Sequence, residues 1–277
     1  MVFDRCFTHG LDGKDRPVPG LTRISKKRKT VFENHSGISG SYSKTINGNM
    51  SQPKEKFIGI PGVGIEVAPE ILEKVQKLFK HAKSSHDWDH TLRVYRLCER
   101  IGAVEGADMD VLRVAAVLHD IGRSCQDQSR GTLCHAEKGA EMAAEILEDF
   151  PIPALRKSNI IHCIASHRFR KGRSPETVEA KVLFDADKID AIGAVGVARA
   201  YLFAGEIGAR LHSSAEDMAS TLPYTTDDTG YREYCVKLSK IKSRLLTREG
   251  KKIAGKRHEF METFFDRFLK EVEGKDE

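Results

Sequence analysis

The middle of the chain carries four residues of metal-binding types in a regular order. His90 comes first, the neighbouring pair His119 and Asp120 follows about 30 residues later, and Asp187 stands another 67 residues on. Neutral imidazoles combined with carboxylates suit Mn, Mg, Co, Ni, Fe or Zn. Such an ion lowers the pKa of a bound water and polarises a phosphoryl oxygen, which is the chemistry of phosphate hydrolysis. We therefore expect these residues to bind a divalent metal ion.

The same residues fall on the apolar faces of expected helices, or at their ends. An imidazole or carboxylate that is buried without a partner costs free energy, so a shared ion is the simplest partner. Gly122 stops the second helix just after the pair, which lets both His119 and Asp120 reach one ion. The apolar residues that define the three faces are Val94, Leu97 and Ile101, then Leu112, Ala115 and Ala116, then Ala191, Ala194 and Ala198.

The ordered set of histidines and aspartates resembles the H…HD…D signature of the HD-domain metal-dependent phosphohydrolase superfamily. An isolated His-Asp pair carries no information, whereas the full set in this order is specific. Further segments look like a bacterial and archaeal branch with nucleotide pyrophosphohydrolase-like members. The resemblance covers roughly 65–272, and the segments that carry it are Ser85–Val94, Leu118–Arg123, Asp185–Ala191, His135–Ala140, Ser166–Phe169 and Thr247–Phe268.

This resemblance implies a role for each matched residue. Asp120 would hold the attacking water in line as well as binding the metal. Asp187 is preferred to Asp185 because the superfamily's ligand is followed by Lys or Arg and, three residues on, by another Asp. Asp185 is then interpreted as a helix N-cap, and Asp190 as an orienting residue or a substrate contact. The implied metal ligands are His90, His119, Asp120 and Asp187.

Two more histidines are candidate site residues outside the H…HD…D set. His135 and His167 also point inward on their helices, and in two-metal members of the superfamily histidines at comparable places bind a second ion. We expect them either to take a second-metal, catalytic or substrate role, or to line the site as hydrogen-bonded side chains. A phosphate at the metal needs further positive charge. Arg123, Arg168 and Lys188 flank the matched motifs and are the candidates for binding the substrate.

Two other kinds of enzyme are disfavoured. The segment His86–His90 spells H-D-x-x-H, close to the H-E-x-x-H of zinc proteases, but Asp lacks the reach of Glu and no third-ligand motif follows. The cyclic-dinucleotide phosphodiesterase branch carries a Gly-Tyr-Pro element, which is absent after Arg168. The substrate expected from the resemblance is therefore a nucleotide or another small phosphorylated metabolite.

The elements that position these residues are helices, and the predicted fold class is all-α. Apolar residues recur at intervals of three and four residues, and no period-two alternation indicates a sheet. We predict an HD-domain helical bundle over 57–275, with a polar loop at 121–134 and another loop at 222–230. The expected helices are 69–83, 86–101, 108–120, 135–149, 154–168, 176–204 with a break, 231–247 and 255–272.

Residues 1–56 differ from the rest in composition. They hold 11 Lys and Arg against 5 Asp and Glu, with a basic cluster at Arg23–Lys29, whereas the remaining chain has a net charge of −1. We expect a disordered basic tail that could make a weak contact with nucleic acid. The absence of a long apolar run or leader predicts no membrane contact and a cytoplasmic location. A metal-binding regulator, or a nucleic-acid-binding protein with this tail as its arm, stays open as an alternative function, and so does the oligomeric state.

Overall fold

The computed structural model describes residues 69–79, 88–129, 131–168, 173–213, 218 and 220–275. The predictions for the 1–56 tail and for His86 lie outside these ranges. Every regular element in the described ranges is a helix, which confirms the all-α class. All of the described residues belong to one compact unit that spans 62–277.

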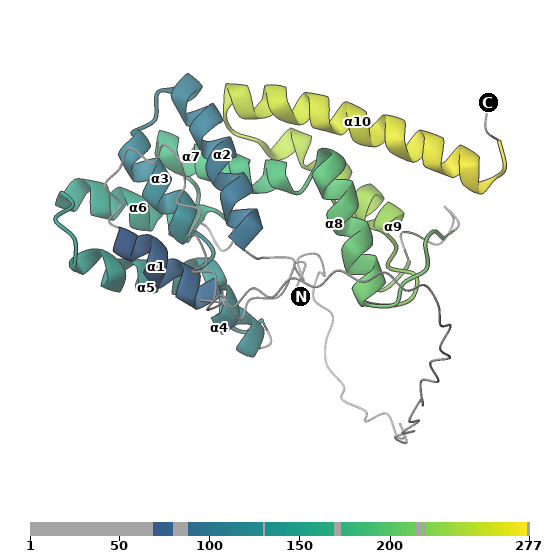
Figure 1. The fold of residues 1–277 in the computed structure, drawn as a ribbon. Coiled ribbons are helices and arrows are strands. Elements are labelled where there is room, and N and C mark those ends of the chain that lie inside the picture. Colours follow the sequence, from purple (N-terminus) through teal and green to yellow (C-terminus); the bar gives the residue numbers. More distant parts are fainter. Residues whose placement is uncertain are drawn as a thin grey trace, which may run out of the picture. The chain divides into compact units, whose positions relative to one another are not determined.

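Four helices form the centre of this unit (Figure 1). Helix α2 (Trp88–Glu105) packs against α3 (Met109–Leu118) and α7 (Val178–Asp190), and α6 (Ala154–Ser166) packs against α3 and α7. Helix α5 (His135–Glu148) covers the outer side of α6. The expected apolar stripe of α2 is confirmed, because Val94, Leu97 and Ile101 are all buried. Burying a side chain of this size stabilises the fold by roughly 1.5 to 3 kcal/mol.

The long helical stretch predicted over 176–204 is broken in two. Helix α7 ends at Asp190 and α8 (Gly193–Glu206) begins three residues later. Gly193 has a φ of +78°, a left-handed conformation that glycine adopts without steric cost, and this changes the direction of the chain. The break leaves Asp187 in the last turn of α7, near the end of a helix rather than in its middle.

Three predicted segments differ from the structure. The expected polar loop at 121–134 contains a short helix, α4 (Arg123–Gln128). The helix expected over 231–247 is only α9 (Gly230–Val236), followed by two 3₁₀ turns, η3 (Leu238–Lys240) and η4 (Lys242–Arg244). The last helix, α10 (Arg248–Val272), begins seven residues earlier than predicted.

Asp185 explains why helix does not run through 245–247. It is fully buried in α7, and its carboxylate accepts hydrogen bonds from the backbone N–H groups of Leu246 and Thr247 and from the Thr247 hydroxyl. These donors bond across to α7 instead of to their own segment. Asp185 therefore does not cap its own helix, whose N-cap is Thr177. It fixes Thr247, the N-cap residue of α10.

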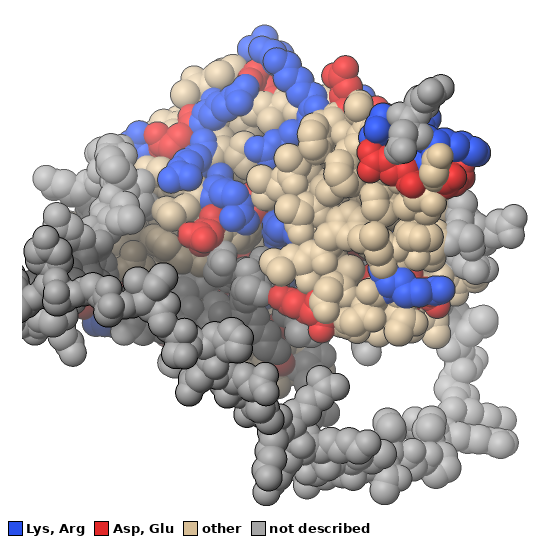
Figure 2. Space-filling model, turned by 45° about the vertical axis from the view of Figure 1, so that its right-hand side comes forward, with Lys and Arg blue, Asp and Glu red and all other residues tan. Residues whose placement is uncertain are grey.

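The remaining described helix, α1 (Pro69–Phe79), packs against α3. No helix among the described residues has both the length and the apolar character needed to cross a bilayer. Charged side chains are spread over the face drawn in Figure 2, with Lys and Arg gathered toward its upper part.

Candidate metal centre

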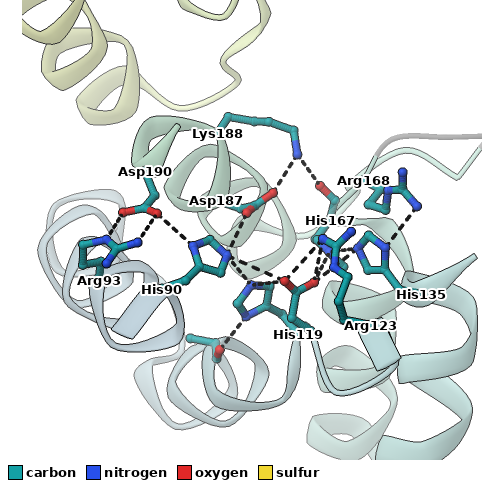
Figure 3. A network of polar contacts seen from close by, with 12 residues as sticks. His90, Arg93, His119, Arg123, His135, His167, Arg168, Asp187, Lys188 and Asp190 are labelled. Atoms are coloured by element: carbon teal, nitrogen blue, oxygen red, sulfur yellow. Dashed lines mark hydrogen bonds and ion pairs between the residues drawn. The ribbon is translucent and has the colours of Figure 1, made fainter. Parts of the chain in front are cut away.

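The residues predicted to bind metal meet at the ends of three helices (Figure 3). His90 lies in the first turn of α2, and His119 and Asp120 follow directly after α3, as the sequence predicted. Asp187 comes from the last turn of α7. Apart from Asp187, whose side chain is 19% exposed, these residues are buried. Asp187 is therefore the most exposed of the four residues.

The first cluster joins His90, His119 and Asp187. The Nε2 atoms of the two histidines are 3.3 Å apart, and the Nε2 of His90 is 3.4 Å from Oδ1 of Asp187. One candidate ligand atom from each of the three residues lies within 4.8 Å of the others. Oδ2 of Asp120 is 3.7 Å from Nε2 of His90 and 3.8 Å from Nε2 of His119. Four side chains thus converge on one point.

A second cluster joins Asp120 to His135 and His167. Oδ1 of Asp120 is 3.2 Å from the Nε2 of His135 and 3.6 Å from the Nε2 of His167, and these two nitrogens are 3.1 Å apart. Their ligand atoms again lie within 4.8 Å of one another. The two oxygens of Asp120 therefore face different clusters, and the aspartate lies between two groups that could each hold an ion.

The outward hydrogen bonds of the histidines show that these clusters suit cations. The Nδ1 atoms of His119 and His167 lie 2.8 and 2.7 Å from the carbonyl oxygens of Ala116 and Ile164. A carbonyl oxygen only accepts, so each Nδ1 carries the proton and a neutral ring turns its Nε2 lone pair inward. Inward lone pairs that face one another and a carboxylate repel unless positive charge lies between them. A divalent cation would supply that charge, and the donor set therefore fits a metal.

Electrostatics favour the protonation states that metal binding needs at His119, Asp120 and Asp187. At His90 burial acts to lower the pKa, but the carboxylates of Asp187 and Asp190 outweigh it and raise the pKa. Burial lowers the pKa of His119 to about 4, helped by the neighbouring histidines, so its ring is neutral at pH 7. Burial acts to raise the pKa of Asp120, but Arg123 and the surrounding histidines hold it well below its usual range. Lys188 and His90 do the same for Asp187, against the effect of its burial.

Asp190 lies on the far side of the His90 ring. Its Oδ2 accepts a 2.8 Å hydrogen bond from Nδ1 of His90, and it also pairs with Nε of Arg93 and Nη1 of Arg199, each at 2.7 Å. It is buried, and Figure 3 draws it behind His90, away from the second cluster. A carboxylate placed in this way fixes the tautomer and direction of a ligating histidine. Of the two roles left open for Asp190, the geometry favours the orienting one.

Close packing at Gly122 brings the second cluster to the first. A Cβ atom at this position would overlap the carbonyl oxygen of His135 and the backbone nitrogen of Gly139. The turn that follows Asp120 can therefore lie directly on α5, which carries His135. The φ of Gly122 is −81°, which any residue can adopt. The sequence interpretation of Gly122 as a helix stop missed this close approach, which is the reason for glycine here.

All three cations predicted to bind substrate reach the clusters. Nη2 of Arg123 is 3.2 Å from Oδ1 of Asp120, and Nζ of Lys188 is 2.7 Å from Oδ2 of Asp187. Arg168 is buried beside His135, with its Nη1 3.0 Å from Nδ1 of that ring. Each of these cations thus contacts a candidate ligand, which the sequence did not indicate.

Gln126 is a site residue that the sequence analysis missed. Its side chain is buried, and its Oε1 lies 2.8 Å from Nδ1 of His135 and 2.7 Å from Nη1 of Arg168. This oxygen can accept from both, which places the proton of His135 on Nδ1 and leaves Nε2 facing Asp120. A glutamine inside an expected polar loop gives no sequence signal, because neither its type nor its spacing indicates burial.

We expect Gln126→Leu to weaken metal binding by about 10- to 100-fold, the usual effect of losing a residue that orients a ligand. Gln126→Glu keeps an acceptor oxygen and should retain most of the affinity. Gln128→Leu, on the exposed side of the same helix, is the matched control. Calorimetric titration of metal-stripped protein with Mn²⁺ measures the change. Equal affinity in Gln126→Leu and the control would show that His135 needs no such partner.

Comparison with known proteins identifies the domain that contains these residues. The HD-domain family model matches residues 87–192, which contain both clusters. The chain is 31% identical over 220 residues to YpgQ of Bacillus subtilis, covering 76% of this chain and 97% of YpgQ. The crystal structure of YpgQ in complex with ADP superposes with a TM-score of 0.57 at 29% identity, over 76% of this chain and 96% of the other.

A predicted HD superfamily hydrolase from an uncultured Thermotogales bacterium has a similar fold. It superposes with a TM-score of 0.55 at 28% identity, over 74% of this chain and 92% of that one. The fold, the matched signature and the His/Asp cluster that could hold a metal ion agree with one another. The chain therefore belongs to the HD-domain superfamily of metal-dependent phosphohydrolases.

Proposed function

We propose that the protein hydrolyses a phosphate ester or phosphoanhydride of a nucleotide, or of another small phosphorylated metabolite, with divalent metal bound at the two clusters. The observation that carries the proposal is the convergence of six ligand side chains on a site that Asp120 divides into two groups. Support for a nucleotide comes from YpgQ, which binds ADP on a similar fold. In this proposal His90, His119 and Asp187 would hold one ion, and Asp120, His135 and His167 would hold a second.

The side chains around the site have separate tasks in the proposed reaction. Bound metal would supply an activated water and polarise a phosphoryl oxygen. Burial acts to raise the pKa of Asp120, but the positive charge of Arg123 outweighs it and holds the pKa well below its usual range. Asp120 is therefore a poor proton acceptor. We assign it instead to holding the attacking water by hydrogen bonding while it ligates. Asp190 keeps the His90 ring in its ligating orientation.

Positive charge near Asp187, the most exposed of the ligands, would stabilise the phosphoryl group. Negative charge spreads over several oxygens in its transition state, and cations fixed nearby lower the barrier. Lys188 is the best placed for this, because it neighbours Asp187 and its side chain is 28% exposed, against 13% for Arg123. Arg168 lies deeper, and it donates to the same Gln126 oxygen that accepts from Nδ1 of His135.

For Lys188→Gln we expect kcat/KM to fall by about 10- to 100-fold, chiefly through a higher KM, because a charge-assisted contact with substrate is lost. Affinity for Mn²⁺ should not fall, since the variant removes a positive charge from beside Asp187. Lys181→Gln, also on α7, is the matched control. Weaker metal binding with an unchanged KM would instead assign Lys188 to supporting the ligand.

A substrate panel tests the proposed function. Metal-stripped protein is reloaded in turn with Mn, Co, Ni, Mg, Fe or Zn and incubated with nucleoside mono-, di- and triphosphates and with sugar phosphates. Release of pyrophosphate or of phosphate then separates a pyrophosphohydrolase from a phosphatase. Metal binding without turnover on any member of the panel would favour the alternative, a metal-binding regulator.

A further inference from the structure

The segment 240–256 carries an excess of positive charge. Seven of its residues are Lys or Arg, and its single acid, Glu249, is buried. The whole chain beyond the tail has a net charge of −1, so this segment is a local excess. Figure 2 shows Lys and Arg gathered over the upper part of the domain, the level of α2 and α10 in Figure 1. The seven exposed cations are Lys240, Lys242, Arg244, Arg248, Lys251, Lys252 and Lys256.

These cations differ from others on the described surface in having few acidic partners. Elsewhere exposed lysines pair with carboxylates, as in Lys74 with Asp149, Lys138 with Glu141 and Lys270 with Asp266. Within the segment, Lys252 lies 3.6 Å from Glu249. Among the described residues no carboxylate lies within ion-pair distance of Lys240, Lys242, Arg248, Lys251 or Lys256. The positive charge of these five side chains is therefore not neutralised by a carboxylate of the described residues.

The position of these cations also costs stability. A helix N-terminus carries partial positive charge, so each cation in its first turns is unfavourable by roughly 0.3 to 1 kcal/mol. Arg248, Lys251 and Lys252 lie in the first five residues of α10, and Lys256 follows one turn after Lys252. The N–H groups at this helix end are already bound, because that of Gly250 donates to the Thr247 hydroxyl and that of Glu249 to Glu105. Folding alone thus gives no reason for the cations.

We propose that the surface of 240–256 binds the phosphate backbone of a single-stranded nucleic acid. Arg248, Lys252 and Lys256 follow one another at intervals of four residues, so they line one side of α10 over about 12 Å. Phe260 follows Lys256 at the same interval and is also exposed. Exposed cations make phosphate contacts that do not depend on sequence. This activity is separate from the proposed hydrolysis, because none of the seven residues belongs to the metal clusters.

An anionic membrane fits this surface less well. A helix that binds a bilayer presents apolar side chains between its cations. The apolar residues in the first turns of α10, Ile253 and Ala254, are both buried, and Leu246 is the exposed large apolar residue of the segment. The segment therefore offers seven cations with one exposed large apolar side chain, and the exposed Phe260 lies one turn beyond Lys256.

The test measures binding of the full chain to a fluorescein-labelled single-stranded DNA of about 20 nucleotides, long enough for several contacts. The variant replaces Lys242, Lys252 and Lys256 with Gln. Its control replaces Lys74, Lys138 and Lys270 with Gln, which removes the same charge where each lysine has an acidic partner. Anisotropy is followed at salt concentrations between about 50 and 200 mM, and vesicles with and without phosphatidylserine are tested alongside.

We expect the wild type and the control to bind the DNA alike. In the triple variant, affinity should be on the order of 100-fold weaker at about 50 mM salt, and the slope of log affinity against log salt should fall by about two, as three lost contacts to a single strand require. Nucleotide hydrolysis should not change. Equal binding by the triple variant and the control, no DNA binding by the wild type, or binding to anionic vesicles alone would each overturn the proposal.

Discussion

Asp120→Asn should lower metal-dependent hydrolysis by about a thousandfold or more. Both carboxylate oxygens are engaged, one toward each cluster, so a single change weakens both metal sites. The amide of asparagine carries no charge and turns an N–H group toward one of the clusters, where a metal ligand must direct a lone pair at the ion. Losing a metal and the group that orients the water removes several kcal/mol of transition-state stabilisation.

The control for this variant is Asp149→Asn, an exposed aspartate whose carboxylate pairs with Lys74. Turnover is measured over a range of Mn²⁺ concentrations, so that weak metal binding is separated from slow chemistry. We expect Asp120→Asn to stay slow even when metal saturates. Full activity at high Mn²⁺ would mean that Asp120 serves only metal affinity and does not act on the water.

Asp185→Ala should destabilise the protein by about 2 to 4 kcal/mol, because it removes one carboxylate acceptor from three hydrogen-bond donors. The variant leaves the N–H groups of Leu246 and Thr247 and the Thr247 hydroxyl without their acceptor at the start of α10. Each buried donor left unsatisfied costs roughly 1 to 3 kcal/mol, and the losses are not additive. Burial raises the pKa of Asp185, and the three donors oppose that rise.

Urea unfolding followed by circular dichroism measures this loss, with Asp266→Ala on the exposed side of α10 as the control. A Thr247→Val variant removes one of the three donors and should lose less stability than Asp185→Ala. Stability within about 0.5 kcal/mol of the control would contradict the anchoring role.

The first cluster could be predicted because it lies on strongly periodic helices. His90 continues the buried stripe of α2, and His119 continues that of α3, so the pattern indicated both the fold and the direction of the ligands. The order of ligands was equally informative, since it resembled a family signature that the comparisons now support. At these positions the apolar pattern of the helix and the order of the ligands pointed to the same residues.

Other features could not be predicted, because they depend on contacts between residues that are distant in the sequence. The link from Asp185 to Leu246 and Thr247 spans more than 60 residues and keeps helix from running through 245–247, which no local pattern reveals. Gln126 became a site residue only because Gly122 lets the turn lie on α5. The charge of 240–256 was hidden in the sequence totals, because acidic residues elsewhere balance it.

In the function proposed above, metal held by the His/Asp clusters drives phosphate hydrolysis. The most direct test measures nucleotide hydrolysis by one preparation of the full-length protein against the number of Mn²⁺ ions bound per chain, starting from metal-stripped protein. We predict no hydrolysis without metal and activity that rises as the clusters fill. Hydrolysis by the stripped protein at the rate of the loaded protein would contradict the account.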